Sequence, residues 1–153
     1  MADAEVELQS FLDKYNPEIA ALGAACVKKL RKLYPTATVW VYDNYNALAV
    51  GFGPPALPAH AIFSVALYPR WVSLFFLQGK DIEDPSRLLQ GAGGAVRHIV
   101  LHSPRDIDQP AVQALFKQAL NQAKTPLPAK GKGELIIQSV SAKQRPRRPV
   151  VRS

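Results

Sequence analysis

Apolar residues near the N-terminus recur with the period of an α-helix. Residues 4–14 place them three and four positions apart, which predicts a short amphipathic helix. Residues 16–18 (NPE) then provide an N-cap, a proline at the first helical position and an acid in the first turn. The second helix that begins there carries an apolar stripe over residues 19–33 and ends before Pro35, which cannot continue it.

Beyond this helix the apolar period changes to two, which is typical of β-strands. Residues 38–43 and 47–52 alternate on either side of a turn and predict a hairpin. The prolines of residues 53–58 interrupt any ladder of hydrogen bonds and predict a loop. Residues 59–67 and 71–77 are two apolar strands with a short connection, which predicts a second hairpin.

The second half of the chain continues with short elements. Residues 84–89 predict a short helix that begins at an Asp-Pro pair and leads into a glycine loop at residues 91–95 (GAGGA). Residues 96–102 alternate again and predict a strand. Residues 108–110 (DQP) begin a last amphipathic helix.

The order of these elements predicts an α+β fold. Short connections between strands exclude βαβ crossovers and favour an antiparallel β-sheet. We expect the two N-terminal helices and the C-terminal helix to pack on one face of this sheet, in two layers. Residues 1–123 would form this domain, and residues 124–153 a basic C-terminal extension. The extension predicts one added strand at residues 134–140, in this sheet or in that of a second copy, and then a flexible tail.

Composition agrees with a single globular domain. Of the 153 residues, 48% are apolar and 20% are charged. Cys26 is the only cysteine, which excludes a disulfide framework and a cysteine cluster for zinc. The N-terminus lacks the pattern of a signal peptide, and the apolar runs fall short of the roughly 20 residues of a membrane-spanning helix. We therefore expect a soluble, cytoplasmic protein without a membrane partner.

The net charge of +7 is located entirely in the C-terminal extension. Residues 1–123 hold eleven Lys and Arg against eleven Asp and Glu, whereas residues 124–153 hold the other eight bases against one acid. A flexible basic arm can bind nucleic-acid phosphates, here nonspecifically because it carries no aromatic residue for base stacking. The residues of this nucleic-acid alternative are Lys143, Arg145, Arg147, Arg148 and Arg152.

The motifs in combination resemble the DUF1801, or YdhG-like, family of small bacterial α+β domains. The resemblance covers roughly residues 5–122 and is carried by HAIFSVALYPRWVSLFFLQG, DPSRLL, the G-x-G-x-x-x-R-H-I strand and the closing Asp-Ile-Asp with its helix. The family includes a frataxin-like iron chaperone, so the resemblance implies an iron-binding chaperone as one alternative function. Many relatives carry Lys where this chain has Gly94, and this departure removes a cation that would favour an anion site in the glycine loop.

The glycine loop does not match a nucleotide-binding motif. Val96 stands where a dinucleotide fingerprint needs its last glycine, and the Gly-Lys-Ser/Thr triplet of a P-loop does not occur. We interpret the loop as a turn in which Gly91 caps the short helix with a positive φ.

Candidate metal ligands are few. His98 and His102 would lie about 13 Å apart on one face of a strand, which is too far for a shared ion. The best local cluster of oxygen ligands for iron or another cation is the acidic trio Asp81, Glu83 and Asp84.

The sequence supports no catalytic residues. Cys26 lies on the buried stripe of the second helix, and Ser64 and Ser73 lie inside apolar strands. Neither G-x-S-x-G nor H-E-x-x-H occurs. A hydrolytic or redox enzyme would require a fold that brings Cys26 or a serine beside His98 in an open cleft.

The strands of the second hairpin are apolar on both faces. Helices in two layers cover only one face of an antiparallel sheet, so the other face predicts a small-ligand groove or a homodimer interface, unless the C-terminal strand covers it. The leading hypothesis is a noncatalytic domain that binds a small ligand or a protein partner through this face. The residues expected to take part are Tyr42, Tyr45, Tyr68, Arg70, Trp71, Arg97 and His98.

Overall fold

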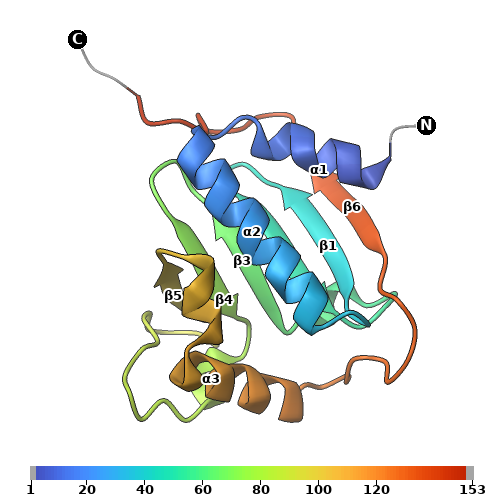
Figure 1. Ribbon diagram of the computed structural model, residues 1–153, viewed down its shortest axis with the longest axis vertical. Helices are drawn as coiled ribbons and strands as arrows, with labels where there is room; N and C mark the ends of the chain where they lie inside the picture. Colours follow the sequence, from blue (N-terminus) through green and yellow to red (C-terminus); the bar gives the residue numbers. More distant parts are fainter. Residues whose placement is uncertain (1–2, 151–153) are drawn as a thin grey trace.

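The computed structural model describes residues 3–150 of the chain (Figure 1). Its helices are α1 (Ala4–Leu12), α2 (Pro17–Leu33) and α3 (Pro110–Asn121), with short 3-10 turns at η1 (Pro58–His60), η2 (Gly79–Asp81) and η3 (Pro104–Asp108). Its strands are β1 (Thr38–Asp43), β2 (Leu48–Gly53), β3 (Phe63–Leu67), β4 (Val72–Phe76), β5 (Arg97–Leu101) and β6 (Leu135–Val140). The predicted α+β class is confirmed.

The six strands form one sheet in the order β5-β4-β3-β2-β1-β6. Neighbouring strands from β1 to β5 are antiparallel, as their short connections require. β6 is parallel to β1, so the sheet is mixed rather than fully antiparallel. The chain between β1 and β6 is long enough for a parallel pairing. The strand predicted at residues 134–140 therefore pairs with a strand of its own chain.

The core lies between the sheet and the helices and is built from alternate strand residues. Val50 lies between Val41 and Val65 in neighbouring strands, and all three are fully buried. The apolar stripe of α2, which crosses the sheet in Figure 1, packs against these side chains. Phe63 of β3 meets Phe116 of α3 edge to face, with ring centroids 4.9 Å apart. The structure therefore shows which face of each strand forms the core, including β3 and β4, whose sequences are apolar on both faces.

The helix predicted at residues 84–89 is wrong, because this segment is a turn without helical structure. Both carboxylate oxygens of Asp84 accept backbone N–H groups, from Leu88 at 3.0 Å and Leu89 at 2.8 Å. Arg87 has a φ of 53°, which interrupts a right-handed helix. An Asp-Pro pair thus caps a turn here just as it would cap a helix. The predicted strand at residues 59–67 is also shorter, since η1 occupies its start.

The glycine loop closes a hairpin rather than ending a helix. Gln90 pairs with His98 through two backbone hydrogen bonds of 2.7 and 3.0 Å, so residues 91–96 connect antiparallel segments. Gly91 has a φ of 116°, and the predicted requirement for positive φ is therefore confirmed although no helix precedes it. The Arg97 guanidinium donates to carbonyls of this loop, including that of Gly94 at 2.8 Å, and not to a carboxylate.

The tail expected to be flexible packs against the β1–β2 hairpin over residues 141–150. The Ser141 N–H donates to the Asp43 carbonyl at 2.9 Å, and the Arg145 N–H donates to the Tyr45 carbonyl at 2.8 Å. Arg147 is only 5% exposed. The prediction of a free basic arm is therefore wrong for this segment, and Arg152 lies outside the described residues. Within residues 3–150, no helix has the length and apolar character needed to cross a membrane.

Candidate functional site

Two hairpin ends and the tail meet at one end of the sheet (Figure 1). β1 and β3 run in the same direction, and β6 is parallel to β1, so the segments that follow these strands lie at the same end. These segments are residues 44–47, residues 68–71 and residues 141–150. The Tyr15 side chain connects the two hairpins, because its hydroxyl donates to the Leu67 carbonyl at 2.8 Å and accepts a hydrogen bond from the Leu48 N–H at 3.0 Å.

The β3–β4 hairpin presents a stacked aromatic pair. The Tyr68 N–H donates to the Trp71 carbonyl at 2.9 Å, and Pro69 restricts the turn between them. The two rings lie 4.8 Å apart with an angle of 16° between their planes. Trp71 is 44% exposed, whereas burial raises the pKa of the Tyr68 hydroxyl. One face of the Trp71 indole thus packs on the Tyr68 ring, and part of the indole remains exposed to solvent as a flat apolar surface.

A buried carboxylate fixes the tail over the neighbouring hairpin. Asp43 is fully buried and pairs with Lys14 Nζ at 2.7 Å and with Arg147 Nη2 at 2.8 Å. Gln144 Nε2 also donates to the Asp43 carbonyl at 3.0 Å. Burial alone would raise the pKa of the Asp43 carboxyl, but the hydrogen bonds from Lys14, Gln144 and Arg147 outweigh burial and lower that pKa. The Arg147 side chain is buried in this ion pair and is therefore unavailable to a ligand.

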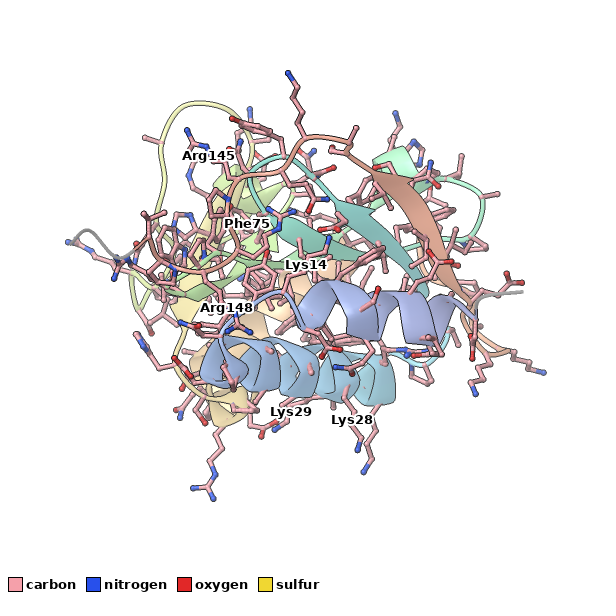
Figure 2. The ribbon with its side chains drawn as sticks, turned by 90° about the horizontal axis from the view of Figure 1, so that it is seen from above. Lys14, Lys28, Lys29, Phe75, Arg145 and Arg148 are labelled. Atoms are coloured by element: carbon pink, nitrogen blue, oxygen red, sulfur yellow. The ribbon has the colours of Figure 1, made fainter. Side chains whose placement is uncertain are left out.

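Two further arginines of the tail, Arg145 and Arg148, lie in the same hollow as the aromatic pair. The Arg145 guanidinium lies 5.8 Å from the centroid of the Tyr45 ring, and Arg148 Nε donates to the Lys14 carbonyl at 3.2 Å. Figure 2 shows Arg145, Arg148 and Lys14 at this end of the molecule. Arg145 and Arg148, together with Arg70 of the hairpin, border a hollow of about 880 Å³ that we call the basic groove. It is lined by Asn46, Tyr68, Pro69, Arg70, Trp71, Arg145, Pro146, Arg148, Pro149 and Val150.

The charge of the basic groove is one-sided. Among the described residues, three arginines line it and no Asp or Glu does. The Asp43 carboxylate, which holds the tail in place, is already shared between Lys14 and Arg147. Because guanidinium groups stay charged and bind oxyanions through two parallel hydrogen bonds, the groove is suited to an anionic ligand.

A second hollow of about 460 Å³ adjoins the groove, and both are lined by Asn46 and Tyr68. It lies on the face of the sheet that points away from the core, which we call the open sheet face. Its floor is formed by small residues of the central strands, Ala49, Ser64 and Ala66, and Phe75 of β4 forms one side. A flat apolar group that stacks in the basic groove could therefore extend onto the sheet.

Most of the open sheet face is not exposed enough to be a large interface. Trp40 is 5% exposed and Ser73 is 1% exposed, while Tyr42 and Phe75 are half-buried. The Ala61 backbone covers the open sheet face at Gly53, because a Cβ on Gly53 would lie only 2.7 Å from the Ala61 Cα. Large aromatic side chains become strongly exposed only at the hairpin ends, where Tyr45 is 50% exposed and Trp71 44%. The geometry thus favours the hairpin end over the middle of the sheet.

The residues expected to bind a ligand are only partly brought together. Tyr45, Tyr68, Arg70 and Trp71 line the two adjoining hollows. Tyr42 and His98 lie on the open sheet face, where His98 packs on Phe75 with ring centroids 5.2 Å apart. Arg97 is bound to the glycine loop and points elsewhere. Asn46 carries no signal in the sequence, and the proximity of Arg145 and Arg148 to the aromatic residues was not predictable, because β6 brings the tail to this end.

The acidic trio does not assemble a cation site. The two Asp84 oxygens already accept backbone hydrogen bonds, and the Glu83 backbone is held by Gln118 at 2.9 and 2.8 Å. Over residues 3–150, no group of three or more His, Cys, Asp and Glu side chains is placed to hold a metal ion. The iron alternative therefore rests on the family resemblance alone.

Candidate nucleophiles are not placed beside a histidine. Cys26 is fully buried, and burial raises its pKa to about 11. Ser64 and His98 lie in one row across the sheet with Phe75 between them, so they are two strand spacings, or about 10 Å, apart. The condition set for a hydrolytic or redox enzyme is not met by these residues.

A further cavity of about 540 Å³ lies between α1 and α2. Its base consists of buried core side chains such as Leu8 and Val27, and its rim includes Arg31, which pairs with Glu5 at 2.8 Å. Its lining also holds Lys28, Lys32 and Lys132, but it contains a single aromatic residue, Tyr34, and therefore no stacked ring pair. We therefore regard the basic groove, and not this cavity, as the candidate site.

Comparisons of the chain with protein-family models, with curated proteins and with solved structures found no match. The function proposed below is therefore based on the geometry of the site.

Proposed function

We propose that the protein is a noncatalytic binding domain whose basic groove binds a ligand with a flat apolar ring and an anionic group. The observation that carries this proposal is the exposed indole of Trp71, stacked on Tyr68, in a groove bordered by Arg70, Arg145 and Arg148. The ring would stack on the indole and the anion would pair with the guanidinium groups. The side chains that form the floor of the adjoining hollow are small, and they leave room for an apolar extension of the ligand.

Each part of the groove has a separate task. Trp71 provides the stacking surface, and Tyr68 keeps the indole in one orientation, so little side-chain entropy is lost on binding. Arg145 and Arg148 provide positive charge from a tail that is held in place by Asp43 and Arg147. Because this tail is ordered before the ligand arrives, the groove is preorganised.

Calorimetric titration with 2-naphthyl phosphate tests the proposal, since this probe combines a flat ring with an anion. We expect it to bind more tightly than either 2-naphthol or inorganic phosphate alone. Trp71→Ala should weaken binding by about 5- to 150-fold, the equivalent of about 1–3 kcal/mol of stacking. The double variant Arg145→Ala with Arg148→Ala should also weaken it.

The matched control removes two exposed cations outside the groove, Lys80→Ala with Lys117→Ala, and should bind the probe like the unmodified protein. Equal affinity of the unmodified protein, Trp71→Ala and the double arginine variant would refute the proposed site. Circular dichroism of each variant checks that the fold is retained.

We also propose membership of the DUF1801-like family and a cytoplasmic location. The family assignment is supported by the motifs over residues 5–122 and the location by the single buried thiol of Cys26. Cell fractionation of the tagged protein tests the location, and recovery from a membrane or secreted fraction would contradict it.

A further inference from the structure

We propose that the physiological ligand of the basic groove is single-stranded nucleic acid, with a base on Trp71 and the adjoining phosphates on Arg145 and Arg148. This inference rests on the proposed function and names the class of ligand. A nucleotide combines in one unit the two groups that the groove recognises, a flat ring and an anion. Aromatic platforms beside a positively charged track are the common means of binding single strands without regard to sequence.

The aromatic and basic residues of the groove come from segments that are far apart in the sequence. The tail holds bases without aromatic residues, and the hairpin ends hold aromatic residues with one arginine, Arg70. Folding places Arg145 over the Tyr45 ring and Arg148 in the same hollow as Trp71. Stacking and phosphate contacts are thus available in one place, which the tail alone could not offer.

Trp71 is accompanied by two other aromatic side chains, Tyr45 and Phe75, although Arg145 lies over the ring of Tyr45. Tyr45 and Trp71 are strongly exposed on the two hairpin ends, and Phe75 borders the adjoining hollow on the sheet. An aromatic side chain on the open face of an antiparallel sheet is a surface on which unpaired bases stack. The hollows meet at Asn46 and Tyr68, so a strand of several nucleotides could follow them without crossing a closed wall.

Three arginines line the groove. Arg147 and Lys14 are paired with Asp43, so Arg70, Arg145 and Arg148 are the cations that line the groove among the described residues. Three phosphate contacts with a single strand give a slope of about −2 when the logarithm of the binding constant is plotted against that of the salt concentration. A duplex would bind less tightly, because its bases are stacked on each other and do not reach Trp71.

Fluorescence anisotropy with a fluorescein-labelled 12-mer of thymidine, measured at several concentrations of KCl, tests this inference. We expect saturable binding with a slope of about −2 and at least tenfold weaker binding of a 12-base-pair duplex. Trp71→Ala should weaken binding by about 5- to 150-fold at unchanged slope. Trp71→Phe keeps an aromatic ring and should retain most of the affinity. The double variant Arg145→Ala with Arg148→Ala should flatten the slope to about −1, while Lys80→Ala with Lys117→Ala should leave it unchanged.

Free nucleotides offer the same chemistry, and competition with adenosine monophosphate separates the two sources. If adenosine monophosphate binds as tightly as the 12-mer, the ligand is a small nucleotide and the inference of a polymer is overturned. If 2-naphthyl phosphate binds in the groove but the 12-mer and the mononucleotide do not, the inference fails while the proposed function stands. Loss of binding of all three probes would overturn both.

Discussion

Asp43 is fully buried between the side chains of Lys14 and Arg147, and its place in the fold explains why the tail is ordered. The arginine side chain is 3% exposed and also donates to the carbonyls of Asn44 and Tyr45. A buried cation without its carboxylate is strongly unfavourable. The position of the basic groove therefore depends on a residue that does not line it.

Replacing Asp43 tests this dependence. Asp43→Asn leaves Arg147 buried without a counter-charge and should lower the free energy of unfolding by about 3–5 kcal/mol. Urea denaturation measures the change. Asp108→Asn is the matched control, because Asp108 pairs with Lys29 at the surface and its loss should cost about 1 kcal/mol or less. A similar small loss for both variants would contradict the account of the tail.

The pH dependence of stability follows from the same carboxyl group. Its pKa is lowered in the folded protein, so the stabilisation is present above the pKa of the unfolded chain, about 3.9, and is lost as the pH falls through the lower folded value. We expect the free energy of unfolding to decrease below about pH 4. In Asp43→Asn this part of the decrease should be absent, which denaturation at several pH values would measure.

Cys26 gives a third prediction for a single residue. Its thiol is fully buried on the side of α2 that faces the core, and burial raises its pKa to about 11. We expect Ellman's reagent to leave Cys26 unmodified at pH 8 in the folded protein and to modify it fully in urea. Rapid modification of the folded protein would mean that the thiol is accessible and would reopen a redox role.

Among the elements, β6 depends on one close approach of two backbones. Gly133 enters the strand where a Cβ would lie 1.6 Å from the Ala37 carbonyl oxygen, and its N–H donates to the Pro35 carbonyl at 2.8 Å. Gly133→Ala should therefore lower the free energy of unfolding by about 1–3 kcal/mol. Gly94→Ala is the control, because nothing lies within 4 Å of its added Cβ and its φ is not positive. Equal denaturation midpoints would show that β6 tolerates displacement.

Periodicity predicted the regular elements well because burial of one face determines them. The stripe of α2 and the alternation in β1, β2 and β5 follow directly from which side chains enter the core. The helix predicted at residues 84–89 was wrong because an Asp-Pro pair stabilises turns and helices by the same hydrogen bonds. The parallel direction of β6 was not predictable, since the β-branched residues that indicate a strand are equally compatible with either direction of pairing.

For the whole molecule, the exposed apolar surface predicts a monomer. Trp40 and Ser73 are buried within the chain itself, so the open sheet face offers little of the roughly 1,000 Å² that a stable interface needs. Light scattering should give a mass close to 16.8 kDa. A stable dimer that is lost in Phe75→Ala would instead support self-association through this face.

The sequence predicted the residues of the candidate site as two separate sets, each for a different kind of ligand. Tyr45, Tyr68, Arg70 and Trp71 were expected to bind a ligand, and Arg145 and Arg148 a nucleic acid. Their meeting depends on the parallel pairing of β6 and on the buried Asp43–Arg147 contact, and neither leaves a signal in local sequence. Arg147 illustrates the difference, because it looked like a free base and is instead an internal partner of Asp43.

The central claim, that the basic groove binds a flat anionic ligand through Trp71, is tested most directly by NMR. The protein has two indole N–H groups that report on different places, since Trp71 is 44% exposed in the groove and Trp40 is 5% exposed under the β2–β3 connection. Addition of 2-naphthyl phosphate should shift the indole signal of Trp71 and the amide signals of Arg145 and Arg148, and leave the indole of Trp40 in place. Shifts confined to Trp40 or to the cavity between α1 and α2, or no shifts at saturating probe, would contradict the account.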